Sequence, residues 1–406
     1  MANILCRIGR GLSAPRGSQR HPQVVAAGPD QRARLWVGAG TQGRSWPGEV
    51  RVEDLGRRQS MEDTLTRYRR VLGEDHPVTL RLAHSLAAGL RALGEHEQAR
   101  ALDEDTLTRY RRVLGGDHPA TLTSANNLAS DLRAVGEHEQ ARALDEDILS
   151  RYRRVFGGDH ADTLRSANNL ASDWRALGEH EQARALDEDI LSRYRRVFGD
   201  DHADTLRSAR NLAADLRALG EHEQARALDE DTLTRYRRVL GEDHPATLLS
   251  ANNLAADLRA LGEHQRARRL HQDTLPRYRR VLGEDHPATL TSANNLANNL
   301  SALGEHQQAR ALHEETLTRR RRVLGCDHPS TLRSAHNLAA DLSELGEHEQ
   351  ARALDEGTLT HYRRVLGENH PSTLLSAHNL AADLRALGEH EQARQLEEWI
   401  KSQHRS

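Results

Sequence analysis

Several residue types are scarce in this 406-residue chain, and each scarcity excludes a class of protein. Cys6 and Cys326 are the only cysteines, too few for a disulfide framework or a cysteine-based zinc site. Lys401 is the only lysine, which excludes a P-loop, because that motif places a lysine on the phosphates of a nucleotide. Aromatic residues make up 3% of the chain, so any core must be built mainly from aliphatic side chains.

Long apolar runs are also missing. None approaches the length needed to span a bilayer, so no membrane partner is expected. The first residues lack the apolar centre of a signal peptide, which predicts a cytoplasmic location. Arginine supplies all but one of the 57 basic residues, a bias that we interpret as the mark of a GC-rich bacterial genome.

The net charge of −3 hides two unlike regions. Residues 1–58 carry 10 arginines against 4 acidic residues, are rich in Gly, Pro and Ser, and show no hydrophobic periodicity. This composition predicts a disordered basic arm. The arm has no clean basic patch and little aromatic interleaving, so nucleic acid is not expected as a partner. Residues 59–406 carry an excess of acidic residues and all of the periodic sequence.

What the chain does contain is a repeat of 42 residues without insertion or deletion. Ala, Leu, Arg and Glu dominate the repeat, and these residues lose little rotamer freedom in a helix. One glycine of each period lies in a loop of the form LG-x-DHP or FG-x-DHA, at Gly73, Gly115, Gly157, Gly199, Gly241, Gly283, Gly325 and Gly367. A second glycine lies in G-E-H, at Gly94, Gly136, Gly178, Gly220, Gly262, Gly304, Gly346 and Gly388.

The two glycines divide each period into two segments, which we call helix A and helix B. In one copy, helix A starts at Pro119, a residue suited to the first helical turn, and its apolar residues step by three and four as far as Gly136. Helix B runs from about His138 to Phe156, where Gly157 supplies a left-handed stop. Because neither helix can bury its apolar stripe alone, we expect antiparallel hairpins that stack into one continuous core.

The pattern predicts 17 helices: an unpaired helix B at residues 60–72 and eight A–B pairs from about residue 77 to 402. The array begins abruptly at Glu62, within a helix B, so we expect either a piece of a longer array or a chain whose true start is Met61. The last helix carries residues typical of a terminal cap: Leu396, Trp399 and Ile400.

The stretch N-L-A-x-x-L-x-x-x-G-E-H-E-Q-A resembles the tetratricopeptide repeat motif. Leu128 and Ala129 match its Leu-Gly pair, while Gly136, His138 and Ala141 match its turn glycine, its next aromatic residue and its packing alanine. The ordinary motif has a period of about 34 residues. The longer period, the LG-x-DHP loop and the A-N-N-L-A stretch are similar to the kinesin light chain subgroup and to bacterial proteins with the same repeats.

This resemblance covers about residues 62–400 and implies an all-α fold, an α-solenoid in which antiparallel helix hairpins form a right-handed superhelix. It also implies a binding scaffold rather than an enzyme. Two residues depart from the motif: Asp145 occupies a position that is usually aromatic, and Ile148 one that is usually alanine. These departures bear on packing details and not on the fold.

The residues that could carry chemistry recur with the repeat. His118 lies beside a helix start and His138 takes an aromatic packing position, so structural roles are expected for the regular histidines. Their spacing gives no i,i+4 pair of the kind that binds metal on a helix. The carboxylates recur in every helix B and are interpreted as a solvated face, and Cys326 has no evident base. We therefore predict no enzyme activity, no metal, no cofactor and no small-molecule substrate.

Internal comparison of the eight copies shows where helix A varies. Three positions, at offsets of zero, three and seven, fall on one helical face that points away from the apolar stripe, and we call them the variable stripe. The first position carries Arg81, Thr123, Arg165, Arg207, Leu249, Thr291, Arg333 and Leu375. The second carries His84, Asn126, Asn168, Arg210, Asn252, Asn294, His336 and His378. The third carries Ala88, Ser130, Ser172, Ala214, Ala256, Asn298, Ala340 and Ala382.

The resemblance implies that this side of helix A lines a concave groove that holds extended peptides, although a free solvent face would vary in the same way. One adjacent polar position hardly varies. Resemblance implies that its asparagines clamp the backbone of a ligand, since one amide both donates and accepts hydrogen bonds. The alternative is a side chain that bonds between neighbouring repeats. This series is Asn127, Asn169, Asn211, Asn253, Asn295, Asn337 and Asn379, with Ser85 first.

The sequence thus predicts a protein–protein interaction scaffold that holds a peptide segment in its groove. The variable stripe carries arginines and no acidic residue, which predicts ligands with acidic or carboxylate groups. Arg207 and Arg210 are the strongest candidates for a hot spot, although Asp173 and Asp215 lie one residue beyond the stripe and could pair with them. The alternative function is the detached sensor half of a bacterial signalling NTPase.

Overall fold

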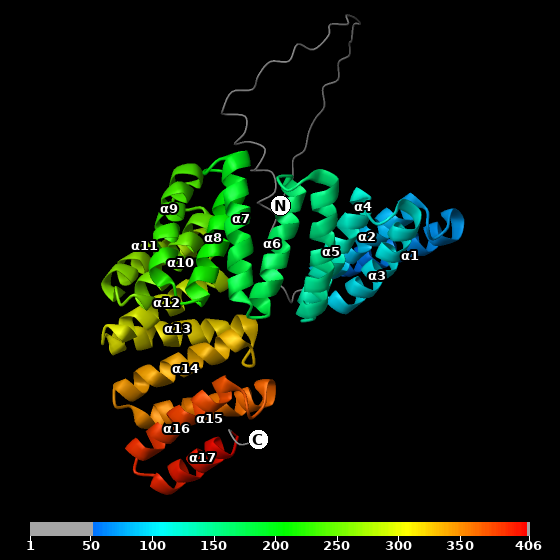
Figure 1. The fold of residues 1–406 in the computed structure, drawn as a ribbon. Coiled ribbons are helices and arrows are strands. Elements are labelled where there is room, and N and C mark those ends of the chain that lie inside the picture. Colours follow the sequence, from blue (N-terminus) through cyan, green and yellow to red (C-terminus); the bar gives the residue numbers. More distant parts are fainter. Residues whose placement is uncertain (1–51, 404–406) are drawn as a thin grey trace, which may run out of the picture. The chain divides into compact units, whose positions relative to one another are not determined.

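The computed structural model describes residues 52–403, and side-chain surroundings from residue 58 onward. These residues form 17 helices and no strand, as the 42-residue period predicts (Figure 1). The predicted disorder of residues 1–51 lies outside the described residues. The unpaired helix B and the first pairs are α1 (Val52–Leu72), α2 (Pro77–Ala92), α3 (His96–Leu114), α4 (Pro119–Ala134), α5 (His138–Phe156), α6 (Ala161–Ala176), α7 (His180–Phe198), α8 (Ala203–Ala218) and α9 (His222–Leu240).

The second half of the array repeats the same lengths, so that even-numbered helices are A helices and odd-numbered helices are B helices. Each helix packs mainly against the helix before it and the helix after it. The remaining helices are α10 (Pro245–Ala260), α11 (His264–Leu282), α12 (Pro287–Ala302), α13 (His306–Leu324), α14 (Pro329–Glu344), α15 (His348–Leu366), α16 (Pro371–Ala386) and α17 (His390–Gln403).

The first helix is longer than the sequence predicts. α1 starts at Val52 and not at residue 60, so the predicted arm of residues 1–58 is wrong for its last seven residues. Gly56 and the lack of a regular apolar stripe hid this extension. Further along α1, Leu65 is 4% exposed and packs with Leu86 and Leu90 of α2, so the unpaired helix B closes the core of the first pair.

Local capping explains why the helices begin and end where they do. In α4, Nδ1 of His118 accepts a hydrogen bond from the backbone N–H of Ala120 at 3.1 Å, and Pro119 occupies the first turn. All eight A helices have a histidine cap of this kind, which confirms the structural role predicted for the loop histidines. Gly157 ends α5 with φ +86°, a conformation that favours glycine.

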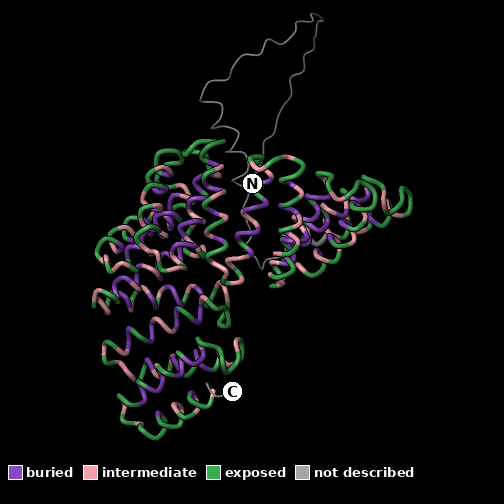
Figure 2. The backbone as a smooth tube through the Cα atoms, in the orientation of Figure 1, coloured by how far each residue is buried: buried purple, intermediate pink, exposed green. Residues whose placement is uncertain are grey.

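The core is a series of small clusters, each shared by one A helix and the B helices on either side of it. Around α4, the cluster joins Leu107 of α3, Leu128 and Leu132 of α4, and Ile148 and Tyr152 of α5. Buried residues accordingly follow the inner sides of successive helices along the array (Figure 2). This arrangement leaves one face of each A helix outside the core.

A buried ion-pair network links each of the first four repeats to the next. Nη1 of Arg133, near the end of α4, lies 2.6 Å from Asp145 on α5 and 3.1 Å from Asp173 on α6. Both aspartates are 0% exposed. We call such a set a junction triad. The other three are Arg91 with Asp103 and Asp131, Arg175 with Asp187 and Asp215, and Arg217 with Asp229 and Asp257.

These triads correct two predictions. Asp145 and its equivalents Asp103, Asp187 and Asp229 do not belong to a solvated face, because they are fully buried against an arginine. Asp173 and Asp215 pair with Arg133 and Arg175, and not with Arg207 or Arg210. Asp145 stands where the motif usually has an aromatic residue because it forms one part of a junction triad.

The last junctions lack the full triad. In the fifth, both aspartates are replaced by buried neutral residues, His271 and Asn299. In the sixth, Ser301 replaces the arginine and donates to Asp341 at 2.6 Å, while His313 lies 2.7 Å from the same carboxylate. The chain therefore changes the charge of its junctions halfway along the array.

The seventh junction has two buried carboxylates and no arginine. Ser343 donates to Asp383 at 2.6 Å, and His348 lies 3.1 Å from the same carboxylate. Asp355 is 0% exposed, and neither of its oxygens has a hydrogen-bond partner. Burial, reinforced by the charge of Asp383, raises the pKa of Asp355 to about 8.

Candidate peptide-binding groove

The first and third positions of the variable stripe lie on the face of each A helix outside the core, whereas the second position, contrary to the sequence prediction, is buried in two repeats. Its third position is exposed or half-buried throughout. Its second position is exposed at His378, half-buried at Asn126, Asn168, Arg210 and His336, and buried at Asn252 and Asn294. The first position is exposed in every repeat: Arg81, Thr123, Arg165, Arg207, Leu249, Thr291, Arg333 and Leu375.

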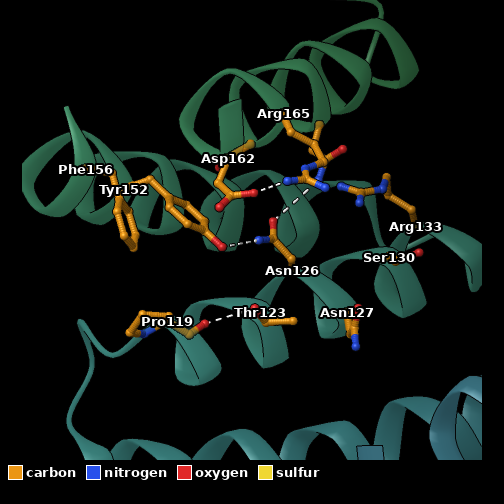
Figure 3. Close-up of a pocket in the computed structure, with 12 residues that line it drawn as sticks. Pro119, Thr123, Asn126, Asn127, Ser130, Arg133, Tyr152, Phe156, Asp162 and Arg165 are labelled. Carbon is orange, nitrogen blue, oxygen red and sulfur yellow. Dashed lines mark hydrogen bonds and ion pairs between the residues drawn. The ribbon is translucent and has the colours of Figure 1, made fainter. Parts of the chain in front are cut away.

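A pocket of about 380 Å³ opens on this face between α4 and α6 (Figure 3). Thr123 and Asn126 line it from α4, Tyr152 from α5, and Arg165 and Asn169 from α6. The structure thus brings variable-stripe residues of two successive A helices to one concave site. The tyrosine that completes the site from helix B has no place in the sequence prediction.

The asparagine series connects neighbouring repeats. Nδ2 of Asn169 donates to Oδ1 of Asn126 at 3.4 Å, and Nδ2 of Asn126 donates to the hydroxyl of Tyr152 at 3.2 Å. The contacts recur between Asn211 and Asn168, and between Asn337 and both Asn294 and Asn298. His84 and His336 are the corresponding partners of Asn127 and Asn379.

Five of the seven asparagines therefore make the bond between repeats that the sequence offered as the alternative to ligand clamping. In the α4–α6 pocket, Asn126 uses its amide and its carbonyl oxygen within the protein. Asn169 uses only one N–H, so its carbonyl oxygen stays available to accept from a ligand backbone. Asn253 and Asn295 are half-buried.

The arginines of the stripe divide into two kinds. Arg165 pairs with Asp162 on its own helix, and Arg207 lies 2.7 Å from Asp204 in the same way. The remaining three make no ion pair with any residue of the described chain. These arginines without an ion pair are Arg81, Arg210 and Arg333.

A further arginine lies beneath the stripe, and sequence reasoning missed it. Arg320 on α13 is 1% exposed, although its register position carries tyrosine in every other B helix from α1 to α15. It donates only to neutral acceptors, including Ser334 at 2.7 Å and Thr291 at 3.4 Å. Burial and the like charge of Arg333 lower its pKa to about 10. The signal available in the sequence was the replacement of this tyrosine by arginine in the middle of a series that otherwise keeps it from Tyr68 to Tyr362.

A second pocket, of about 250 Å³, is lined by residues of α13, α14, α15 and the loop after α13. Cys326, Gly357 and His361 line it, each at a position where its repeat departs from the others. Nδ1 of His361 lies 2.5 Å from Asp327. Among residues 52–403, no group of three His, Cys, Asp or Glu side chains is arranged to hold a metal ion.

Comparison with known proteins identifies the repeats. A family model described as "Tetratricopeptide repeat" matches residues 79–146, 121–173, 168–237, 208–280, 249–321, 292–356 and 335–400, and a second model with this description matches residues 56–78. The chain belongs to the tetratricopeptide repeat (TPR) family. Such repeats support a protein-interaction scaffold with protein or peptide partners, and TPR scaffolds are generally non-enzymatic.

Solved structures similar to this chain were also found. A Podosopora anserina protein with nearly identical TPR-like repeats of the kinesin light chain type is 27% identical, over 50% of this chain and 97% of that chain, with a TM-score of 0.46. The apo quorum sensor NprR from B. thuringiensis is 14% identical, over 87% of this chain and 99% of that chain, with a TM-score of 0.60.

A third similar structure is a signal transduction ATPase with numerous domains and a TPR sensor, from Pyrococcus horikoshii. It is 12% identical, over 87% of this chain and 55% of that chain, with a TM-score of 0.52, and so shows the fold alone. A search of curated proteins gave no match. No helix within residues 52–403 is long and apolar enough to cross a bilayer.

Proposed function

We propose that this TPR protein is a scaffold that binds an extended, acidic peptide segment along the variable stripe of its A helices. The observation that carries the proposal is the set of arginines without an ion pair, Arg81, Arg210 and Arg333, on a face that the core leaves uncovered. Guanidinium groups bind carboxylates through two parallel, charge-assisted hydrogen bonds. The α4–α6 pocket supports the proposal, because it offers polar side chains from two successive repeats at one site.

The asparagine series has a second part in the proposed binding mode. Its N–H groups hold neighbouring repeats together, while carbonyl oxygens such as that of Asn169 accept hydrogen bonds from the ligand backbone. Backbone contacts of this kind fix an extended peptide without selecting its side chains. Selectivity for acidic residues then comes from the arginines of the stripe.

The test compares two arginines that differ in one respect. Arg207 is held by Asp204, whereas Arg210, three residues later on the same helix, makes no ion pair. The purified array is screened against acidic, neutral and basic peptide libraries, and the best binder is measured with each single alanine variant and with the double variant Arg207→Ala, Arg210→Ala. We expect Arg210→Ala to weaken binding about tenfold or more, and Arg207→Ala to weaken it less.

The control is Arg196→Ala. Arg196 is an exposed residue of the B helix α7, outside the variable stripe, and it forms an ion pair with Asp159. Preference for basic peptides, or equal binding by the double variant, would show that the stripe does not recognise carboxylates. The sensor alternative predicted from the sequence has no observation in its favour beyond a shared fold.

A further inference from the structure

The residues that line the α4–α6 pocket have register counterparts four repeats later, on α12, α13 and α14, and the two sets differ in charge. The 42-residue register maps Thr123 onto Thr291 and Arg165 onto Arg333. Five lining positions change type, three of them in charge. Tyr152 becomes Arg320, and Asp162, the carboxylate that pairs with Arg165, becomes Ser330. Arg133, which Asp145 and Asp173 already neutralise, becomes Ser301. The counterpart set therefore gains a cation that no carboxylate holds and loses the anion beside the stripe arginine.

The geometry of Arg320 shows how this charge is held. Nη1 donates to the carbonyl of Ser330 at 2.8 Å and to Ser334 at 2.7 Å. Nη2 makes two longer bonds, to the carbonyl of Leu290 at 3.3 Å and to Thr291 at 3.4 Å. All four acceptors are neutral, so they satisfy the donors but leave the buried charge uncompensated.

An uncompensated charge in a protein interior is costly, and the nearest charged neighbour makes the cost larger. Arg333 is also a cation, and its charge acts against that of Arg320. Neither arginine has an ion pair within the described chain. An anion placed between the exposed guanidinium of Arg333 and the hydroxyl of Thr291 would lower the energy of both arginines.

We propose that the α12–α14 junction is the anion-binding subsite of the groove, in which Arg333 and Thr291 contact a ligand carboxylate and Arg320 attracts it from below. This inference rests on the proposed function and fixes where along the array an acidic group of the peptide binds. Arg320 acts as a positioning residue, because it attracts the ligand without touching it and donates a hydrogen bond to Thr291, which does touch it.

The experiment measures binding of fluorescent hexapeptides by anisotropy at low and high salt. An amidated hexaglutamate supplies side-chain carboxylates, a Gly–Ser hexapeptide with a free carboxyl terminus supplies one main-chain carboxylate, and its amidated form supplies none. The main variant is Arg320→Tyr, which restores the residue of the other repeats and so is expected to fold. We expect it to bind the preferred carboxylate about 5- to 10-fold more weakly at low salt, and less so at high salt.

Two further variants make the result specific. Ser330→Asp restores the internal carboxylate in the register of Asp162, and we expect the same loss of binding because Arg333 then has a partner in the protein. Arg322→Ala removes an exposed arginine two residues from Arg320, where it pairs with Asp285, and we expect no change. The two carboxylate peptides distinguish an acidic side chain from a carboxyl terminus as the source of the anion.

Binding of both carboxylate peptides within about twofold of wild type by Arg320→Tyr and Ser330→Asp would overturn the subsite. If Arg210→Ala still weakened that binding, the groove would remain an acidic-peptide site with its anion held elsewhere. Failure of the wild-type array to bind either carboxylate peptide better than the amidated neutral one would overturn the proposed function and the subsite together.

Discussion

At the scale of single residues, this TPR protein buries charged groups at the junctions between its repeats. One arginine serves two aspartates in each of the first four junctions, so it can neutralise only one of them. Burial raises the pKa of Asp145 to about 7, and Arg133 offsets this only in part. Near neutral pH, the carboxyl that the arginine does not neutralise therefore tends to keep its proton. Stability of the array is consequently tied to pH.

Asp355 gives the clearest pH prediction. Its pKa is about 8 in the folded protein, with Asp383 as the nearest acid, His348 beside Asp383, and Tyr362 within electrostatic reach. An unfolded aspartate has a pKa near 4. Because the folded value is the higher one, the protonated group stabilises the fold fully below about pH 4, and this contribution is lost progressively up to about pH 8.

The variant Asp355→Asn removes this titration without changing size. Urea denaturation measures the free energy of unfolding between pH 5 and pH 8.5. As the pH rises, this free energy should fall less steeply in the variant than in wild type, by up to about 1.4 kcal/mol per pH unit. The variant should also be the more stable protein at pH 8.5. Identical pH profiles for the variant and wild type would show that Asp355 does not titrate in this range.

Arg175 tests the junction triad itself. The variant Arg175→Ser leaves Asp187 and Asp215 buried without a cation, the arrangement that the chain already has around Ser343. We expect a loss of about 3–5 kcal/mol at pH 8, and a smaller loss at pH 5.5, where the carboxyls can be protonated. Arg196→Ala, at an exposed ion pair, should cost less than about 1 kcal/mol. Equal effects of the two variants in urea denaturation would contradict the triad.

At the scale of helices, the repeat explains nearly every boundary. Histidine caps, first-turn prolines and left-handed glycines are local signals, so the sequence alone predicts α4 and α5 to the residue at their starts. α1 was predicted too short, because its first residues lack both a cap and an apolar stripe. The presence of a capping residue therefore decides how accurately the start of a helix can be predicted from sequence.

The site was harder to predict than the helices. Exposure of the first and third positions of the variable stripe follows from their offset against the apolar stripe. The burial of Asp145 does not, because Arg133 lies 12 residues away on the facing helix and Asp173, which binds the same arginine, lies 28 residues away on the next hairpin. Arg320 was missed for a related reason: an arginine in a basic stretch is expected to be solvated, and only the packed helices show that it is buried.

Two truncations test the role of α1. Removing residues 2–57 keeps Leu65 and the ion pair between Arg58 and Glu95, so the melting temperature should stay within about 2 °C of the full chain. Removing residues 2–72 exposes the apolar face of α2 that Leu65 covers, and should lower the melting temperature by several degrees. Circular dichroism measures the two melting temperatures. Equal values for both truncations would show that α1 does not close the core.

At the scale of the whole molecule, the array is nearly one-dimensional, because each helix packs mainly against its chain neighbours. Stability of such arrays is close to a sum of repeat and junction contributions. The copies that start at Asp145 and Asp187 differ at only four positions, given as pairs: Gly158 and Asp200, Asn168 and Arg210, Ser172 and Ala214, Trp174 and Leu216. Their junctions use the same triad, so one copy can stand in for the other.

Deletion of residues 159–200 removes one period and rejoins the loop after Gly158 in register. Arg133 then meets Asp215 in place of Asp173, and we expect a folded array with unchanged helicity per residue and modestly lower stability. Deletion of residues 179–199 removes α7 alone and leaves α6 facing α8 out of register. Circular dichroism and urea denaturation should show a cooperative transition for the first deletion only, and the same outcome for both would contradict modular junctions.

The matching triads also bear on how such a chain can change over generations. Nearly identical repeats are substrates for unequal recombination, which adds or removes whole coding units. The first four junctions accept such an exchange without leaving a buried charge unpaired, because any of their arginines fits any of their aspartate pairs. The later junctions carry individual combinations, and Arg320 occurs once. Recombination can therefore add or remove repeats among the first four junctions without unpairing a buried charge. The later junctions, and the repeat that contains Arg320, do not allow such an exchange.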